Sequence, residues 1–272
     1  EWLLPYDIRN KEAKRIGLVM AGNIPLVGFH DVLCILLSGH QLVANISSKD
    51  CLLTEWLFSN LIDIDPSLSN YIHRSNSPLK EVAAVIATGS DNSARYFDFY
   101  YGHLPHIIRR NRNSVAVLTG NETTSELQGL GNDMFRYFGL GCRNVAKLYV
   151  PANYDFIPLL EAIAPFAVKL LGHSKYRNNY RYQKALFTVL NQPHIANEFV
   201  VFTADNRFSS PLAVVHYEHY ANKNELHKHL DNEASKIQCM VGKNYLDFGK
   251  AQAPQLADYA DGVDTMQFLL TL

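Results

Sequence analysis

A cysteine set among glycines is the residue of this sequence best suited to covalent chemistry. Cys142 lies in the segment FGLGCRNVAKLYVP (residues 138–151), directly after Gly139, Leu140 and Gly141. Glycines allow a substrate carbonyl to approach the sulfur, and nearby peptide N–H groups or a helix N-terminus stabilise a thiolate. The alternative is a small buried hydrophobe, the interpretation we adopt for Cys34 within VLCILLSG. The glycine context alone leaves both roles open for Cys142.

Small polar residues follow four apolar segments that are typical of buried strands. The segments that carry them are Gly22-Asn23, Asn45-Ile46-Ser47-Ser48-Lys49, Thr88-Gly89-Ser90 and Thr119-Gly120-Asn121. Taken singly, these are ordinary turn and N-cap residues. As a set they indicate a ligand site, because ligands of open parallel sheets bind beyond the carboxyl ends of the strands. The sequence contains neither a GxGxxG motif nor a Walker-type lysine loop.

The elements that would position these residues alternate between strands and helices. Strands are predicted at residues 16–22, 41–47, 81–90 and 114–120, and helices at 32–39, 51–62, 94–104 and 126–138. This alternation predicts parallel βαβ units, and the unbroken apolar runs indicate a sheet buried on both faces. A second region continues through residues 144–151 and a tyrosine-rich stretch at 176–182 to apolar segments at 198–204 and 212–218.

Composition excludes several classes of partner. The chain has 272 residues, 47% of them hydrophobic, and 25 basic against 26 acidic residues give a net charge of −1. This balance offers no electrostatic reason to expect nucleic acid or an anionic membrane as partner, and no apolar run reaches the roughly 18 to 20 residues of a membrane span. The four cysteines are widely spaced and form no CxxC pair. We therefore expect a reducing, cytoplasmic location and no metal site.

Three segments carry a resemblance to the aldehyde dehydrogenase superfamily, which runs from about Arg15 to Asp264. MAGNIPLVGFHDVLCILLSGHQLVANISSKD is similar to the stretch from Pro-Trp-Asn-Phe-Pro to Lys-Pro-Ser-Glu, IATGSDNSARY resembles the Phe-Thr-Gly-Ser segment, and GLGCRNVAKLYVP resembles the catalytic cysteine segment. AGNIPLVGFHD, HIIRRNRNSVAVLTG and YFGLGCRNVAKLYVP further resemble the acyl-CoA reductase (LuxC-type) branch.

The resemblance implies an aldehyde-dehydrogenase-like α/β fold. A Rossmann-type nucleotide-binding domain with a parallel sheet would take residues 1–116, an α/β catalytic domain residues 117–245, and a C-terminal tail residues 246–272. The tail would pack on the first domain or on a partner subunit, and we expect a homo-oligomer. Because the sequence begins at Glu1 without a Met or a signal-like segment, we also expect part of the natural N-terminal region to be absent.

The resemblance also implies roles for individual residues. Cys142 matches the nucleophile, and Asn23 matches the asparagine whose amide forms the oxyanion hole together with the backbone N–H of the nucleophile. The remaining matches imply a nicotinamide dinucleotide. Its adenosine ribose would lie at Asn45, Ser47, Ser48 and Lys49, and its pyrophosphate at Thr88, Gly89 and Ser90, with Ala21 and Gly22 beside them.

The sequence departs from the superfamily at three carboxylates. Residues 45–48 lack the glutamate that binds the ribose hydroxyls, so that Ser48 and Lys49 favour NADPH. Leu118, Thr119, Gly120 and Asn121 are aligned with Glu-Leu-Gly-Gly, whose glutamate activates hydrolytic water, and Glu122 is the candidate to replace that base. A carboxylate that grips the nicotinamide ribose in relatives is also missing near residues 207–212, to which we assign no role.

These departures predict the reduction of an acyl-CoA or acyl-protein thioester by NADPH to an aldehyde and a free thiol. Two alternatives remain: an NAD(P)-dependent dehydrogenase that oxidises aldehydes, and a catalytically silent dinucleotide-binding module. His30, His40, His103 and His106 are further candidates for acid–base chemistry, and we expect structural or solvent roles for His30 and His40. Residues 109–112 (RRNR) are expected to form a solvated loop, or else a patch for a phosphate or an acidic partner.

Overall fold

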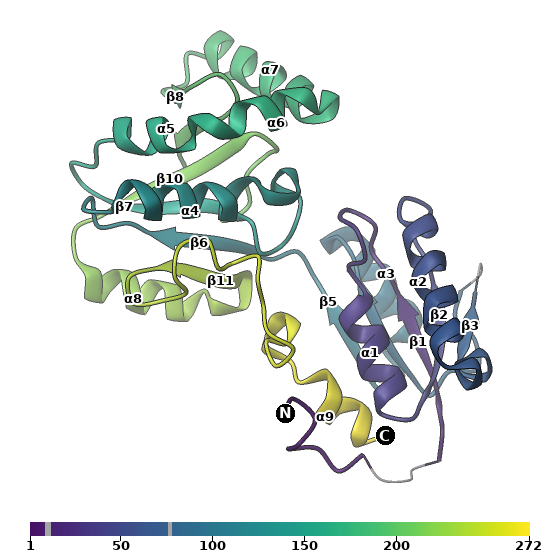
Figure 1. Ribbon diagram of the computed structural model, residues 1–272. Coiled ribbons are helices and arrows are strands. Elements are labelled where there is room, and N and C mark those ends of the chain that lie inside the picture. The colour runs from purple at the N-terminus through teal and green to yellow at the C-terminus, as the bar shows by residue number, and fades with distance from the viewer. Residues whose placement is uncertain (9–11, 76–77) are drawn as a thin grey trace. The chain divides into compact units, whose positions relative to one another are not determined.

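The chain forms two compact units in a computed structural model that describes residues 1–8, 12–75 and 78–272 (Figure 1). The first unit comprises Glu1–Asn111 and Gln255–Leu272, and the second comprises Arg112–Pro254. This division differs from the boundary expected after residue 116, which would cut a strand of the second sheet. It also divides the expected C-terminal tail, because residues 246–254 stay with the second unit and the rest returns to the first.

The sheet of the first unit is parallel and changes direction once. Its strands follow the order β3-β2-β1-β4-β5, where the members are β1 (Arg15–Val19), β2 (Gln41–Asn45), β3 (Ile72–Arg74), β4 (Ala84–Thr88) and β5 (His106–Arg109). The chain adds β2 and β3 on one side of β1, and then returns to add β4 and β5 on the other side. The reversal places a topological switch point between β1 and β4, where open α/β sheets bind their ligands.

Helices and a loop cover the two faces of this sheet. The helices of this unit are α1 (Phe29–Leu37), α2 (Cys51–Ile64), α3 (Asp91–Tyr101) and α9 (Thr265–Leu270), with short 3₁₀ turns at Pro66–Asn70 and Ala260–Gly262. On one face, Ile16 and Ile86 pack with Ile35 of α1, Phe58 of α2 and Met266 of α9. The other face is covered by residues 79–82 and by the end of α3. The C-terminal residues therefore complete the core of the first unit.

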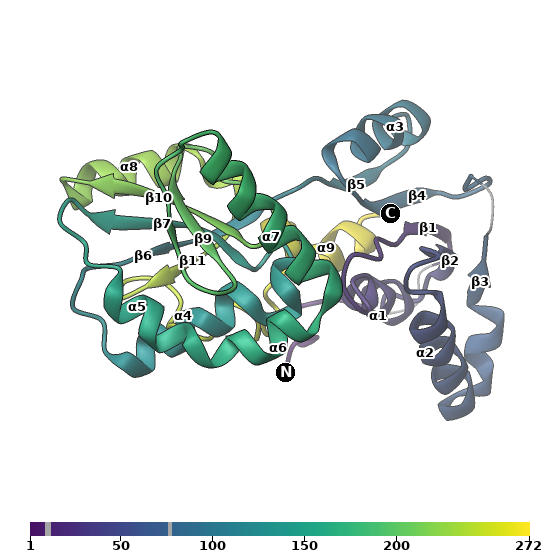
Figure 2. The ribbon, with the colours of Figure 1, turned by 90° about the horizontal axis from the view of Figure 1, so that it is seen from above.

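The second unit is built on a mixed sheet with the order β11-β6-β7-β10-β9-β8 (Figure 2). Its strands are β6 (Asn113–Val117), β7 (Val145–Pro151), β8 (Ile195–Ala196), β9 (Val201–Ala204), β10 (Val214–Tyr220) and β11 (Ile237–Gly242). All neighbouring pairs are parallel except β8 with β9. The parallel pairs bring the beginnings of β6, β7 and β10 to one edge of the sheet and their ends to the opposite edge.

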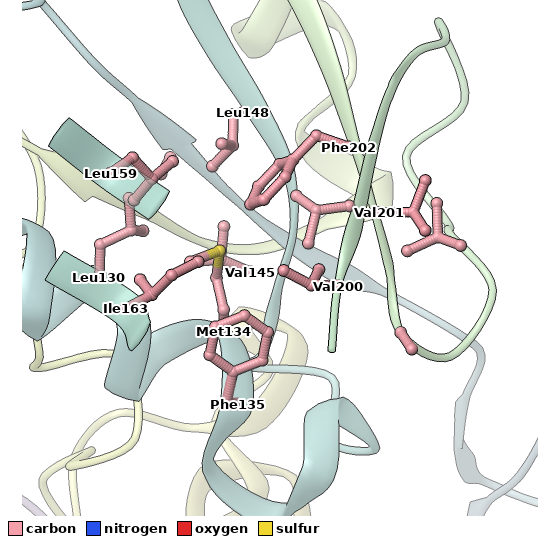
Figure 3. Packing of buried hydrophobic residues seen from close by; sticks show 14 of the residues in the cluster. Leu130, Met134, Phe135, Val145, Leu148, Leu159, Ile163, Val200, Val201 and Phe202 are labelled. Atoms are coloured by element: carbon pink, nitrogen blue, oxygen red, sulfur yellow. The ribbon is translucent and has the colours of Figure 1, made fainter. Parts of the chain in front are cut away.

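The helices of the second unit lie on both faces of its sheet. They are α4 (Thr124–Phe135), α5 (Ile157–Ile163), α6 (Ala167–Gly172), α7 (Ser174–Val189) and α8 (Lys223–Asn232), with 3₁₀ turns at Arg136–Gly139, Ala164–Phe166 and Ala234–Lys236. Leu130 and Met134 of α4 and Leu159 of α5 pack on Leu148 of β7 (Figure 3). On the opposite face, Leu226 of α8 packs against Tyr149. Because helices cover both faces of the sheet, the strand segments are buried on both sides and lack an alternation of polar and apolar residues.

One predicted helix is shorter in the structure than the sequence indicated. The helix expected at residues 126–138 ends at Phe135, because Tyr137 and Phe138 have left-handed backbone angles (φ of 54° and 59°) that no α-helix accepts. Within the described ranges, no helix is by itself both long enough and apolar enough to cross a bilayer. The pair Ile157–Gly172 and Ser174–Val189 meets that length and composition only when counted together, and it bends by 114°.

Candidate functional site

The exits of β1 and β2 lie against each other in the first unit. The two strands are paired up to Val19 and Asn45, so the residues that follow them emerge side by side. A Cβ atom built on Gly22 would lie 2.4 Å from Ser47 Oγ and 3.2 Å from Lys49 Cβ. Only a glycine fits this position without a shift of its neighbours. Three of the expected cofactor residues, Gly22, Ser47 and Lys49, are therefore together.

The exit of β4 adds a helix N-terminus to the same edge of the sheet. β4 pairs with β1 up to Ala87 and Val19, and Thr88 to Ser90 lead from it into α3. Ser90 caps this helix, because its Oγ accepts a hydrogen bond of 3.2 Å from the backbone N–H of Ser93. The N-terminus of a helix favours anions, since its free N–H groups and its dipole both point outward. Polar groups from β1, β2 and β4 thus gather at the switch point.

One carboxylate near this edge faces inward. Asp50 is buried at the start of α2, and its Oδ2 accepts a hydrogen bond of 2.7 Å from the backbone N–H of Leu26. Leu26 has a left-handed φ of 54°, so Asp50 stabilises an unfavourable turn between β1 and α1. Ser48 and Lys49, by contrast, are exposed. Sequence reasoning missed the role of Asp50, which no local pattern signals.

Cys142 is exposed in the second unit, between α4 and β7. Its carbonyl oxygen accepts a hydrogen bond of 3.1 Å from Ser114 Oγ at the beginning of β6. Exposure rules out the buried-hydrophobe alternative for this cysteine. Cys34 is the opposite case, because it is fully buried in α1 and burial raises its thiol pKa to about 12. Cys34 is the inert packing residue that the sequence predicts.

The loop that carries Cys142 has an unusual backbone. Tyr137, Phe138 and Gly139 are all left-handed, with φ of 54°, 59° and 73°. Each of the two aromatic residues costs about 1 to 3 kcal/mol in this conformation, so surrounding contacts must hold the loop in place. Phe138 stacks on His173 with ring centroids 4.1 Å apart. Strain of this kind is common at functional sites.

A small pocket of about 40 Å³ lies beside this loop. Phe138, Gly139 and Asn144 line it from the loop, Tyr176 lines it from α7, and residues 210–215 line it from the connection into β10. The Tyr176 hydroxyl is buried and has no hydrogen-bond partner in the part of the chain that the structure describes. Part of the segment 207–212, to which the sequence assigned no role, therefore lies at a pocket shared with the Cys142 loop. Only the order of the strands in the sheet could have indicated this.

Leu118 and Thr119, which were aligned with the missing base, lie at the edge of the sheet opposite Cys142. Ser114, which contacts Cys142, pairs with Val145, whereas the backbone N–H of Leu118 donates to Tyr149 O at 2.9 Å. Leu118 is four residue steps along the chain from Ser114, which is about 13 Å at the rise of a β-strand. The prediction that Leu118 or Thr119 replaces a glutamate beside Cys142 is therefore wrong.

Glu122 has a local structural role at this opposite edge. One carboxylate oxygen accepts hydrogen bonds from Thr119 N–H and Thr119 Oγ1, and the other accepts one of 3.0 Å from Gly120 N–H. These bonds close the turn between β6 and α4. Glu122 therefore cannot replace the base at Cys142.

The basic segment at residues 109–112 is only partly solvated. Arg109 is buried at the end of β5, where it donates to Asp31 Oδ2 at 2.6 Å and to Thr265 Oγ1 at 3.0 Å. The solvated loop expected here is thus wrong for Arg109, because its partners on α1 and α9 are distant in sequence. Arg110 is exposed and pairs with Asp98.

The four histidines are structural or exposed residues, as expected for His30 and His40. His40 is buried, and its Nδ1 accepts from the backbone N–H of Lys14. His30 packs against the rings of Trp2 and Tyr259 in the same unit. His103 and His106 are exposed.

Comparisons with known proteins identify the fold. No family model matches the chain, and no curated protein sequence matches it. Aldehyde dehydrogenase 21 from Physcomitrella patens, solved with the reaction product succinate, is 13% identical over 94% of this chain and 66% of its own, with a TM-score of 0.69. The Mycobacterium tuberculosis aldehyde dehydrogenase complexed with NAD+ is 14% identical over 78% and 53%, with a TM-score of 0.62.

A third structure gives the same result. The NAD-dependent aldehyde dehydrogenase from Sinorhizobium meliloti is 10% identical over 84% of this chain and 54% of its own, with a TM-score of 0.62. The chain thus spans between about half and two thirds of the length of these structures. The nucleotide-binding candidates and Asn23 belong to the first unit and Cys142 to the second. The chain has an aldehyde-dehydrogenase-like fold, with a parallel Rossmann-type sheet in one unit and an α/β sheet in the other.

Proposed function

We propose that the protein reduces an acyl thioester to an aldehyde with NADPH, through an acyl group held on Cys142. The observation that carries this proposal is the exposed Cys142 on a strained, hydrogen-bonded loop, in a chain of aldehyde-dehydrogenase-like fold. An exposed thiol at the end of a structured loop is accessible to a substrate carbonyl. The acyl donor is an acyl-CoA or an acyl-protein thioester.

The residues at the switch point of the first unit fit a nicotinamide dinucleotide. Gly22 leaves no room for a side chain beside Ser47, and Ser90 opens a helix N-terminus suited to a pyrophosphate. Ser48 and Lys49 are exposed where a 2′-phosphate would bind, while Asp50 is turned inward to Leu26. This arrangement supports NADPH over NADH. The bound cofactor would supply the hydride that reduces the acyl group.

The protein's own residues would act in a covalent sequence. The Cys142 thiolate attacks the thioester carbonyl carbon, a C–S bond forms, and the carbonyl oxygen becomes an oxyanion. From the resemblance, Asn23 and the backbone N–H of Cys142 are the proposed donors to that oxyanion. The oxyanion collapses, the C–S bond to the donor breaks, the donor leaves as a thiolate that takes a proton from solvent, and the acyl group stays on Cys142. Release of the aldehyde restores the Cys142 thiolate.

The direction of the reaction rests on a missing carboxylate. An aldehyde-oxidising enzyme of this fold needs a base that activates water against the acyl-enzyme, and the resemblance aligned that base with residues 118–121. Residues 99–121 contain no Asp or Glu, and Glu122 is occupied at the opposite edge of the sheet from Cys142. A thioester reductase has no use for such a base, because it must exclude water. Because the aligned residues and Glu122 both lie away from Cys142, the resemblance identifies no base for water at Cys142, and reduction is the direction that we propose.

Aldehyde oxidation is the second candidate. It is favoured by the similar structures, which include an aldehyde dehydrogenase complexed with NAD+ and an NAD-dependent aldehyde dehydrogenase. It requires a base from a residue that the resemblance does not identify.

One experiment separates the two candidates. The protein is incubated with NADPH and acyl-CoAs of increasing chain length, and NADPH absorbance and aldehyde are followed. Parallel reactions contain an aldehyde with NAD+ or NADP+ and are assayed for acid. We expect NADPH consumption with equal aldehyde formation, and none with Cys142→Ala. Acid production from the aldehyde, without reduction of any acyl-CoA, would favour the dehydrogenase instead.

A further inference from the structure

The side chain of Asn144 is buried at the start of β7 and makes four hydrogen bonds to backbone groups. Its Oδ1 accepts from the backbone N–H of Gly141 at 2.8 Å. Its Nδ2 donates to the carbonyl oxygens of Asp133 (3.0 Å), Met134 (3.2 Å) and Arg136 (2.8 Å). Asn144 is only 2% exposed. The short side chain of asparagine combines a carbonyl oxygen, which accepts hydrogen bonds, with an NH₂ group that has two hydrogens to donate.

These bonds give partners to the carbonyl groups at the C-terminal end of α4. The last carbonyl groups of a helix have no partner within the helix, and leaving them buried and unpaired is costly. Asp133 and Met134 are in the last turn of α4, and Arg136 follows it. The Asn144 amide takes the carbonyls of all three. It therefore ends the helix and closes the loop of residues 136–144 on itself.

The Asn144 amide, the Asn144 backbone and Ser114 together fix the peptide groups around Cys142. On the N-terminal side, the Gly141 N–H is held by Asn144 Oδ1, and the Gly141 carbonyl accepts from the backbone N–H of Asn144 at 3.0 Å. On the C-terminal side, the Cys142 carbonyl is held by Ser114 Oγ. Since residues 137–139 are left-handed, the loop would relax if this hydrogen bonding were lost.

We propose that Asn144 is a positioning residue, which holds the Cys142 backbone in the orientation required for attack on the substrate carbonyl. This inference rests on the proposed function, in which Cys142 is the nucleophile. Nucleophilic attack on a thioester requires alignment, and a misplacement of about 1 Å costs roughly 10²-fold in rate. Alkylation by a small reagent such as iodoacetamide demands only an accessible thiolate. Loss of Asn144 should therefore slow acylation far more than alkylation.

The test compares these two rates in Asn144→Ala and in the wild type. Acylation of Cys142 by an acyl-CoA and alkylation by iodoacetamide are both followed by intact mass. We expect acylation to fall by about 10²-fold and alkylation to change much less. Asn179→Ala is the matched control, because it removes an exposed amide that donates to a helix carbonyl at 2.8 Å. Equal acylation in Asn144→Ala and wild type, or a proportional loss of both rates, would overturn the proposal.

A second variant covers the case in which Asn144→Ala does not fold. Asn144→Asp keeps the shape, but an ionised carboxylate would face the carbonyl oxygens of Asp133, Met134 and Arg136 and could donate to none of them. The neutral carboxyl can accept from Gly141 N–H and donate once. The ratio of acylation to alkylation in Asn144→Asp should therefore rise relative to wild type as the pH is lowered. A ratio that follows wild type at every pH would contradict the positioning role.

Charged groups adjoin the loop in both proteins. They are the Asp133 carboxyl, whose pKa burial raises to about 6, the Arg136 guanidinium over the Tyr137 ring, and the Arg143 guanidinium. Dividing by the alkylation rate removes the change in thiolate fraction with pH.

A failure of the proposed function can be distinguished from a failure of the positioning role of Asn144. In that case the wild type is alkylated at Cys142 but is not acylated by any acyl-CoA. Hydrogen exchange of the loop of residues 136–144 then still tests Asn144. Faster exchange confined to this loop in Asn144→Ala supports the positioning role, whereas unchanged exchange overturns it.

Discussion

At the scale of single residues, the surroundings of each cysteine determine its chemistry. Cys34 is buried beside Asp31, so burial and then the neighbouring charge raise its pKa and keep it protonated. Cys239 is half-buried with its Sγ 3.0 Å from Ser114 Oγ, and burial raises its pKa as well. Cys142 alone of the four is exposed. We therefore expect Cys142 to react with an acyl donor faster than Cys239, and Cys239 faster than Cys34.

Replacing Cys142 should therefore remove the covalent intermediate. In Cys142→Ala we expect neither an acyl adduct nor aldehyde, since no other cysteine combines exposure with a structured loop. Intact mass after incubation with an acyl-CoA measures the adduct, and peptide mapping locates it. Cys34→Ala and Cys51→Ala serve as matched controls and should be acylated as the wild type is. An adduct mapped to any cysteine other than Cys142 would refute the assignment.

The choice of cofactor is also a single-residue property. The exposed Lys49 ammonium at the exit of β2 would attract a 2′-phosphate, and a charge-assisted contact of this kind contributes about 1.5 to 3 kcal/mol. Lys49→Glu should therefore shift the ratio of NADPH to NADH affinity by about 10- to 10²-fold toward NADH. Titrations of both cofactors measure the ratio. Lys80→Glu introduces the same charge change at an exposed residue that precedes β4, and it should leave the ratio of NADPH to NADH affinity unaltered. Equal wild-type affinities for NADPH and NADH would rule out this role of Lys49.

At the scale of elements, a buried ion pair joins β5, α1 and α9. The side chains of Arg109 and Asp31 are 6% and 5% exposed, and Arg109 also donates to Thr265 in the first turn of α9. Breaking such a pair leaves an uncompensated buried charge, which costs about 3 to 5 kcal/mol. The C-terminal residues should therefore depend on this pair for their packing in the first unit.

Arg109→Leu should lower the free energy of unfolding of the first unit by about 3 to 5 kcal/mol. Both tryptophans, Trp2 and Trp56, belong to this unit, so urea titration followed by tryptophan fluorescence reports on it alone. Arg110→Leu is the control, because its partly exposed pair with Asp98 is worth at most about 1 kcal/mol. The double variant Arg109→Leu with Asp31→Leu should recover much of the loss. Equal effects of Arg109→Leu and Arg110→Leu would contradict this account.

At the scale of the whole molecule, the proposed function predicts a long-lived acyl-enzyme. A positioned general base accelerates a step by about 10²- to 10⁴-fold, or roughly 3 to 5 kcal/mol, and the proposed function assigns no such base to Cys142. After acylation with a radiolabelled acyl-CoA and removal of the donor, the label should persist in buffer. It should leave rapidly when NADPH or a free thiol is added.

Glu122→Gln provides the matched variant for this measurement. Because Glu122 is hydrogen-bonded to Thr119 and Gly120 at the edge of the sheet opposite Cys142, its replacement should not change the rate of label loss. Rapid release of free fatty acid from the wild type in buffer alone would show that another residue acts as the base. Aldehyde oxidation would then become the better proposal.

The local sequence predicted several of the elements and nominated the candidate residues, whose roles stay predictions. Apolar runs ending in small polar residues predicted β1, β2, β4 and β6, because hydrophobic burial and turn chemistry act over a few residues. The same logic singled out Cys142 among its glycines, and the family resemblance predicted the fold. Short strands such as β3 and β5 were missed, because three or four residues carry too little periodic signal.

Which residues meet was decided by the tertiary structure. Leu118 follows Ser114 by only four residues, yet the direction of β6 carries it to the edge opposite Cys142. Arg109 reads as part of a solvated basic run, but Asp31 and Thr265 come to it from α1 and α9 and make its burial possible. Asp50 turns inward because a loop after another strand needs its carboxylate. In each case the partner is remote in sequence, and strand order and direction, which no local pattern encodes, determine whether the two groups share an edge of the sheet.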